Sequence, residues 1–176
     1  MRMVSCVAVL SLFFVSLVQA QAGSKQKKGV AWLSPQAAQA RLQVAPKPLL
    51  IDVYTTWCQY CRLMDATTWR HDSVAAYVAE HFIAIKFDAE SKLPVSWQGS
   101  EYVYQPRFKV HQLAVSWLQG NMVYPSTVLV PPQGSPQVIP GALQVREAET
   151  LLKYYGSGAY LQQRFEDFRQ GFSPNW

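Results

Sequence analysis

Two cysteines separated by two residues are the most reactive feature of this 176-residue sequence. Cys58 and Cys61 are two of its three cysteines, and the third, Cys6, lies in an apolar stretch near the start of the chain. A disulfide across so short a loop removes little chain entropy and therefore adds little stability. Thiol–disulfide chemistry or binding of a soft metal ion therefore explains the pair better than a structural role does.

The residues on either side of the pair predict a buried strand that leads into a helix. Residues 49–54 form a short apolar run rich in strand-forming side chains, and residues 61–69 can continue as a helix. A thiol at the start of a helix faces free backbone N–H groups and the positive end of the helix dipole, and both favour the thiolate. We therefore expect Cys58 to be an exposed nucleophile and Cys61 to be the covered thiol that resolves a mixed disulfide.

The remaining hydrophobic pattern predicts a single α/β domain built around a sheet. A strand over 82–88 follows the cysteine helix and a further helix that Asp72 or Ser73 caps, so this βαβ unit should place its two strands parallel. A hairpin of strands over 126–130 and 137–139 should come later. The other predicted elements are a helix from Pro35 to about Leu42 capped by Ser34, a strand over 101–104, and helices over 107–119, 145–155 and 159–172.

The first 22 residues are typical of a signal peptide. Arg2 precedes an apolar run of about 15 residues, which is short for a membrane span of about 20 residues, and small residues then offer a cleavage site. We predict a flexible polar segment over 23–29 and a domain over 30–176, exported to the periplasm. An uncleaved signal that anchors the protein in the membrane is the alternative.

The charge pattern does not predict binding to nucleic acid. The net charge is +5, but the basic residues are scattered apart from Lys25, Lys27 and Lys28, and no basic face or recognition module is evident. With 49% hydrophobic and 15% charged residues, the chain should form a packed core. No nicotinamide- or flavin-binding motif is present, so we expect no cofactor beyond the cysteine pair itself.

The run from Leu50 to Cys61, LIDVYTTWCQYC, resembles the active site of the thioredoxin superfamily. The resemblance implies a thioredoxin fold, in which helices flank a central mixed sheet. Asp52 matches the buried acid behind the family's cysteines, and an isolated buried carboxylate, whose pKa is raised, can accept the proton of Cys61. Tyr124 and Pro125 match the segment whose cis-proline faces the cysteines, where the Tyr124 backbone would pair with an extended substrate.

The resemblance covers residues 47–155. More specifically, the C-terminal tail and three short motifs resemble exported bacterial thioredoxin-like proteins, often from Bacteroidetes; the motifs are Met64-Asp65, Phe87 to Glu90, and His111 to Ala114. The resemblance implies that exported protein substrates contact Trp57, Gln59, Tyr60, Tyr124 and Pro125. Two features depart from ordinary thioredoxin: an insertion at about 91–120, which can wall the site and narrow the choice of substrate, and a helical extension at about 157–176. Gln59 and Tyr60 bring no positive charge to the thiols, which favours a reductant. Because no nicotinamide or flavin motif is present, we expect a membrane thiol donor to supply the electrons.

Two other functions fit the same residues. Cys58 and Cys61 can bind copper or zinc as soft ligands, although a closed zinc site needs about four ligands and would require dimerisation. The thioredoxin fold can also act as a non-catalytic peptide-binding module. Four further residues receive no role: Lys86, which strand alternation permits but does not require to face Asp52, and the histidines His71, His81 and His111, which lie away from the cysteines in the sequence.

Overall fold

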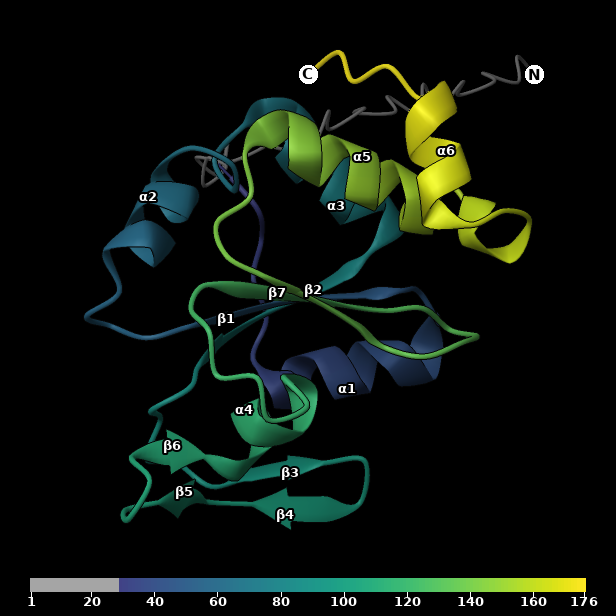
Figure 1. The fold of residues 1–176 in the computed structure, drawn as a ribbon. Coiled ribbons are helices and arrows are strands. Elements are labelled where there is room, and N and C mark those ends of the chain that lie inside the picture. Colours follow the sequence, from purple (N-terminus) through teal and green to yellow (C-terminus); the bar gives the residue numbers. More distant parts are fainter. Residues whose placement is uncertain (1–28) are drawn as a thin grey trace, which may run out of the picture.

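A four-stranded mixed sheet lies at the centre of the fold (Figure 1). The computed structural model describes residues 29–176, so the predicted signal peptide, Cys6 and nearly all of the polar segment predicted over 23–29 lie outside the described residues. The strand order is β2-β1-β7-β8, with bounds Leu49–Tyr54 for β1, Ile83–Asp88 for β2, Ser126–Val130 for β7 and Gln137–Pro140 for β8. β1 pairs parallel with β2 and antiparallel with β7, and β7 pairs antiparallel with β8, which confirms the predicted mixed sheet.

Helices cover both faces of this sheet (Figure 1). One face carries α2 (Gln59–Ala66), α3 (Asp72–His81) and α5 (Val145–Gly156), and the other carries α1 (Pro35–Val44) and α4 (Gln112–Trp117). The Ser34 hydroxyl accepts a hydrogen bond from the Ala37 N–H, which confirms Ser34 as the N-cap of α1. The start of α3 differs from the prediction, because His71 occupies the N-cap position and makes no side-chain capping bond there.

Strand β1 is buried from Leu49 to Val53 because helices pack on both faces of the sheet. Side chains alternate along the strand, so Ile51 and Val53 join the core with α1 and α4, whereas Leu50 joins the core with Met64 of α2. Asp52 therefore points to the same face as Leu50, the face that α2 covers. This alternation places a carboxylate directly beneath the helix that carries Cys61.

The insertion between β2 and β7 folds as two short hairpins followed by one short helix. β3 (Val95–Trp97) pairs with β4 (Ser100–Tyr102), and β5 (Tyr104–Gln105) pairs with β6 (Val110–His111) ahead of α4. The helix predicted over 107–119 is therefore wrong in its first part, and the strand predicted over 101–104 is split between β4 and β5. A turn at Lys109, whose φ is 51°, interrupts the helical path, and pairing with β5 then holds Val110 extended.

The C-terminal extension is not the single helix predicted over 159–172. A 3₁₀ turn (Ala159–Leu161) is followed by α6 (Phe165–Gly171). The Tyr154 hydroxyl donates a 2.7 Å hydrogen bond to the Gln163 carbonyl, an acceptor that an unbroken helix would use internally. Phe165 and Phe168 then pack against the Tyr154 ring, each with its centroid 5.3 Å away. Within residues 29–176, no helix is long and apolar enough to cross a membrane.

Candidate functional site

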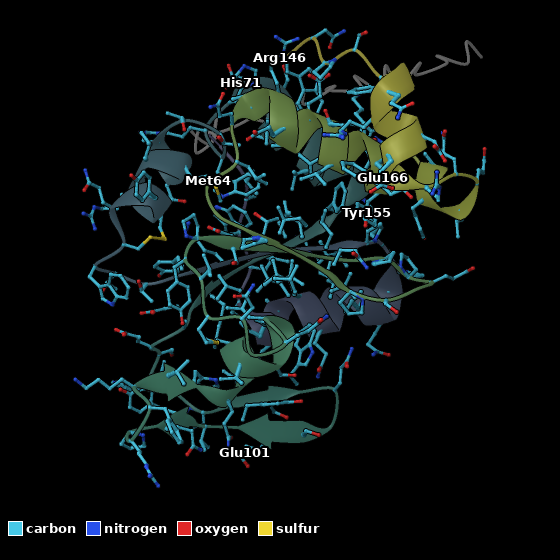
Figure 2. All side chains as sticks on the ribbon, in the orientation of Figure 1. Met64, His71, Glu101, Arg146, Tyr155 and Glu166 are labelled. Atoms are coloured by element: carbon cyan, nitrogen blue, oxygen red, sulfur yellow. A yellow bond between two sulfur atoms is a disulfide. The ribbon has the colours of Figure 1, made fainter. Side chains whose placement is uncertain are left out.

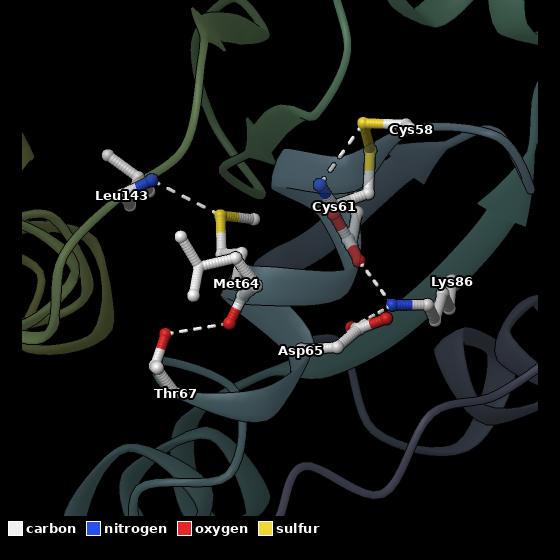
Figure 3. A network of polar contacts seen from close by, with 9 residues as sticks. Cys58, Cys61, Met64, Asp65, Thr67, Lys86 and Leu143 are labelled. Carbon is white, nitrogen blue, oxygen red and sulfur yellow. Dashed lines mark hydrogen bonds and ion pairs between the residues drawn. A yellow bond between two sulfur atoms is a disulfide. The ribbon is translucent and has the colours of Figure 1, made fainter.

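Cys58 and Cys61 are joined by a disulfide at the start of α2, with their Cα atoms 5.3 Å apart. α2 begins at Gln59, two residues earlier than predicted, so Cys58 is the N-cap residue and its Sγ accepts a 3.1 Å hydrogen bond from the Cys61 N–H (Figure 3). The N–H groups of the first helical turn are otherwise free to stabilise negative charge. The sulfur of Cys58 therefore lies where a thiolate would receive most support from the helix.

The two cysteines do not differ in exposure as the sequence predicted. Cys58 is 4% exposed and Cys61 is 3% exposed, so the expectation of an open Cys58 beside a covered Cys61 is wrong for the disulfide form. The reason is that the Cys58 sulfur turns inward over the helix start to reach its partner. The flanking aromatic residues Trp57 and Tyr60 are 63% and 66% exposed, and Figure 2 shows the disulfide towards the left side of the molecule. Position on the helix, rather than exposure, therefore distinguishes the two sulfurs.

Tyr124 and Pro125 lie beside the disulfide because β7 pairs with β1. The register places Ser126 opposite Val53, so the residues before Ser126 stand next to the loop that leads to Cys58. The Tyr124–Pro125 peptide bond is cis. Within residues 29–176, the Tyr124 N–H and C=O make no hydrogen bond, which leaves them free to pair with an added strand.

Trp57 connects the cysteine loop to this proline segment. Its ring packs edge-on against Tyr124, with centroids 6.1 Å apart, and its Nε1–H donates a 3.2 Å hydrogen bond to the Glu90 carboxylate. Burial, together with the nearby Glu90 and Asp88 carboxylates, raises the pKa of Tyr124 to about 12, so its hydroxyl stays neutral. The structure thus brings Trp57 and Tyr124 together at the disulfide. Gln59 and Tyr60 project outward from the first turn of α2.

Asp52 is buried behind the disulfide, and its carboxylate is paired with a lysine. Asp52 is 2% exposed, and its Oδ2 lies 2.7 Å from the Lys86 Nζ, which also contacts the Asp65 carboxylate (Figure 3). The rings of Trp32 and Tyr54 flank the ammonium group, with centroids 5.4 Å and 4.9 Å from Nζ. The predicted burial of Asp52 is observed, and Lys86, whose position facing Asp52 the sequence left open, is its partner.

Lys86 and Asp65 are residues of the site to which the sequence reasoning gave no role, although Lys86 was considered as a residue that could face Asp52. Lys86 is the register partner of Asp52 on the parallel strand β2, and directly paired residues project to the same face of a sheet. Asp65 follows Cys61 by four positions on α2, so it lies on the same face of the helix one turn later. Both signals are present in the sequence, but they become compelling only once the strand register is known.

In this cluster, burial and the neighbouring charges shift the pKa values of Asp52 and Lys86 in opposite directions. Burial raises the pKa of Asp52, and the attraction of Lys86, which lowers it, does not offset that effect. For Lys86, burial lowers the pKa, but the Asp52 and Asp65 carboxylates outweigh burial and leave it raised. Asp52 Oδ1 is buried without a hydrogen-bond partner in the described part of the chain. Asp52 is therefore a carboxyl group that holds a proton at a higher pH than an ordinary aspartate does.

A cavity of about 420 Å³ joins this cluster to solvent. Its lining includes Asp65 and Lys86 together with the aromatic rings of Trp32 and Trp69. A cavity of this volume is large enough to hold several water molecules. The cavity therefore meets the cluster on the side of Lys86 and Asp65, at the sheet edge formed by β2.

The three histidines lie outside this site. His71 occupies the N-cap position of α3 without a capping bond, His81 lies 3.7 Å from the Glu80 carboxylate, and His111 is buried in the insertion. Across residues 29–176, no group of three or more histidine, cysteine or acidic side chains is arranged to hold a metal ion. The two sulfurs of the metal-binding alternative therefore have no further ligands close by in the described chain.

Comparison with known proteins places this geometry in a family. The model of a family described as a thioredoxin-like domain matches residues 35–156. A protein of Bacteroides thetaiotaomicron provisionally assigned as a disulphide-isomerase is 26% identical, with a TM-score of 0.51 over 78% of this chain and 99% of that one. A thioredoxin-fold protein from Helicobacter pylori is 18% identical, with a TM-score of 0.52 over 71% of this chain and 79% of that one. No curated protein matches the chain.

Proposed function

The chain belongs to the thioredoxin-like domain family, and from this premise we propose that it is a thiol–disulfide oxidoreductase acting on exported proteins through Cys58 and Cys61. The observation that carries the proposal is the disulfide at the N-terminus of α2, where the Cys58 sulfur accepts the Cys61 N–H. The free backbone of Tyr124 next to this disulfide supports a polypeptide as the substrate. The provisional assignment of the Bacteroides thetaiotaomicron relative is consistent with disulfide exchange on proteins.

In the reducing direction, the reaction begins with the reduced pair. The Cys58 thiolate attacks one sulfur of a substrate disulfide, which forms a Cys58–substrate disulfide and releases the other substrate sulfur as a thiolate. The Cys61 thiol then loses its proton and attacks the Cys58 sulfur. This second step forms the Cys58–Cys61 disulfide and releases the remaining substrate sulfur as a thiolate. Two electrons have then passed from the protein dithiol to the substrate.

The buried carboxylate supplies the proton chemistry of the second step. Cys61 must be deprotonated while it is covered, and Asp52 lies on the face of the sheet beneath α2. Because burial raises its pKa, Asp52 accepts a proton at a higher pH than an ordinary aspartate does, and its partner Lys86 lines the nearby cavity. Lys86 limits the rise of that pKa.

The direction of transfer and the place of action are part of the same proposal. The residues between the cysteines, Gln59 and Tyr60, carry no cation that would strongly stabilise the Cys58 thiolate, which favours reduction of substrates. The apolar segment predicted as a signal peptide favours the periplasm, where a membrane thiol donor would renew the dithiol. Measurement of the Cys58–Cys61 potential against glutathione tests the direction, and cell fractionation tests the location.

Reduction of insulin by the protein in the presence of a dithiol donor tests the activity. Cys58→Ser should abolish turnover, whereas Cys61→Ser should still attack and should accumulate a mixed disulfide with the substrate. Equal turnover by the protein and by Cys58→Ser would overturn the proposal. Retained turnover in Cys61→Ser with no trapped substrate would overturn the assignment of Cys61 as the resolving thiol.

A further inference from the structure

The insertion forms a second hollow on the side of the molecule that carries the disulfide. This groove has a volume of about 700 Å³, and its walls come from the turn between β5 and β6, from α4 and from the segment before Pro125. Its apolar lining consists of Phe108, Val110, Val115, Met122 and Tyr124. Phe108 is 68% exposed and Val115 is 36% exposed, so the groove presents apolar surface to solvent.

The groove is continuous with the surroundings of the disulfide. Tyr124 and Glu90 line the groove, and both also contact Trp57, the residue before Cys58. In Figure 1 the β5–β6 hairpin and the start of α2 lie on the same, left side of the molecule. An extended chain that paired with the Tyr124 backbone would therefore pass from the disulfide towards the groove.

The turn between β5 and β6 brings positive charge to the wall of the groove. Lys109 lines the groove, and the Arg107 guanidinium lies over the Phe108 ring, 5.5 Å from the centroid. Glu90 also lines the groove, and its carboxylate accepts a hydrogen bond from the Trp57 indole. A carboxylate beside an apolar group bound against Phe108 would therefore meet the cations of this turn.

We propose that this groove, the insertion groove, selects protein substrates that carry a large apolar side chain with an acidic residue beside it, close to the reacting cysteine. The proposal rests on the proposed disulfide exchange and specifies the substrate class of that site. A hollow of about 700 Å³ suits one or two side chains. A stable dimer would instead need roughly 800 Å² buried on each partner. The continuity with Trp57 and Tyr124 also favours a segment of the substrate over a second copy of the chain.

Three mixed disulfides with 5-thio-2-nitrobenzoate test the proposal, because the coloured thiolate is released in the first step for each of them. The first probe contains a cysteine peptide with Phe and Glu near the cysteine. In the second probe, Ala replaces the Phe and Gln replaces the Glu of that peptide. The third probe contains free cysteine in place of a peptide. The reduced protein carries Cys61→Ser, so the reaction stops once the Cys58–peptide disulfide forms. The rate of thiolate release is compared among the probes.

Two variants disturb the groove, and each has a matched control. Val115→Arg fills the groove from an exposed position of α4, and Val44→Arg makes the same change at an 86% exposed position at the end of α1. Phe108→Ala removes the apolar ring, and Leu161→Ala truncates an apolar side chain that is 60% exposed elsewhere. All four positions are exposed, so the variants should keep the thermal midpoint of the parent.

The parent protein should react about tenfold faster with the Phe–Glu peptide than with the Ala–Gln peptide, the effect expected from burying one large side chain. Val115→Arg and Phe108→Ala should lose most of this preference, while both controls keep it and all proteins react equally with the free-cysteine probe. Lys109→Asn should lose only the part due to Glu, about threefold, and asparagine tolerates the positive φ of that position.

Each other outcome overturns a specific claim. Equal rates of the parent with both peptides, or an undiminished preference in Val115→Arg, would overturn the insertion groove as a substrate site. If the rate falls as the protein concentration is raised, and sedimentation shows that dimers form over the same range, the groove would belong to a second copy of the chain. That result would overturn the proposal as well. Absence of reaction with all three probes, free cysteine included, would instead overturn the proposed function on which the groove depends.

Discussion

Asp52, behind the disulfide, and His111, inside the insertion, are both buried ionisable side chains, 2% and 0% exposed. Both ring nitrogens of His111 are bonded: Nε2–H donates to the Leu93 carbonyl at 3.1 Å, and Nδ1 accepts from the Leu113 N–H at 3.1 Å. Asp52 has one oxygen on Lys86 and one with no partner in the described structure. The histidine is thus locked in one neutral form, whereas the aspartate retains an oxygen that can take up a proton.

The surroundings of Asp52 and His111 also distinguish a group that can exchange protons from one that is fixed. His111 packs edge-on against Phe87, and burial lowers its pKa, with the Leu93 bond acting weakly in the opposite direction. Asp52 is paired with Lys86, which lines a cavity, and burial raises the pKa of Asp52. Both shifts favour the neutral form, but only Asp52 lies beneath the helix of the cysteines. The comparison separates a buried polar group that stabilises the fold from one that can exchange protons.

His111→Ala should give the largest effect, a loss of about 3 kcal/mol in the free energy of unfolding. It removes the contact with Phe87 and leaves the Leu93 carbonyl and the Leu113 N–H without partners. Urea unfolding at pH 7 measures it, with His81→Ala as a control at a partly exposed position where the change should stay within about 0.5 kcal/mol. Because the native pKa is lowered, the stability that neutral His111 provides is present above pH 6.5 and is lost as the pH falls through the native pKa.

A loss below about 1 kcal/mol in His111→Ala would contradict a structural role for that histidine. The rate with a small disulfide should be unchanged per folded molecule, because His111 does not contact the cysteines. A changed rate at constant folded fraction would break the distinction between the two regions.

Asp52→Asn should have the opposite sign and raise the free energy of unfolding at neutral pH, because it removes a charge whose burial is unfavourable. The native pKa of Asp52 is raised, so its contribution to stability is fully present below its ordinary value of 3.8 and is lost as the pH rises through the native pKa. The difference between Asp52→Asn and the parent should therefore be small at pH 3.8 and should grow to a plateau above the native pKa. Unfolding curves over a pH series measure this slope, and a constant difference at all pH values would refute it.

The same variant should slow the resolving step while sparing the attack by Cys58. Without the carboxylate, Cys61 loses its proton directly to water, and release of the second substrate thiol should fall roughly tenfold. Single-turnover reduction of a peptide disulfide separates the two steps. An equal loss in both steps would indicate damage to the geometry of α2 rather than loss of a base.

Much of the region around the disulfide was predictable because its structure is local. The apolar run of Leu49–Tyr54 and the N-terminal position of Cys58 specify a buried strand and a helix start within a dozen residues. The burial of Asp52 also followed from its place in that run. The Lys86 and Asp65 contacts did not, because they depend on the register of β1 with β2 and on the packing of α2 over the sheet.

The insertion was predicted less well because its structure depends on contacts between its own short segments. Residues 107–119 have helical spacing, yet pairing of Val110 and His111 with Tyr104 and Gln105 overrides it over the first turn. Only α4 remains helical, and the His111 ring caps its start. A two-residue strand leaves no periodic pattern that could compete with a helical one in the sequence.

Lys86→Met should have a smaller effect than either change above, a loss of roughly 0.5–1 kcal/mol. Methionine keeps the apolar stem between Trp32 and Tyr54, and Asp52 can become protonated once its partner is gone. The attraction of Lys86 lowers the pKa of Asp52, so its removal should move the pH midpoint of the resolving step upward. Lys92→Met, at an exposed lysine of the insertion, is the control that should leave the midpoint in place.

Asp65→Asn should change stability least, by less than about 0.5 kcal/mol, because the Asp65 side chain is 39% exposed and its bond to Lys86 is weakened by solvent. The effect of Asp65→Asn on the pH midpoint of the resolving step should nevertheless be measurable, and its sign should be opposite to that of Lys86→Met. The Asp65 carboxylate raises the pKa of Asp52, so its removal should move the pH midpoint downward. Opposite shifts from the two neighbours, with little change in stability, are what a proton-exchanging Asp52 requires. Shifts of the same sign, or none, would mean that Asp52 is a fixed structural group like His111.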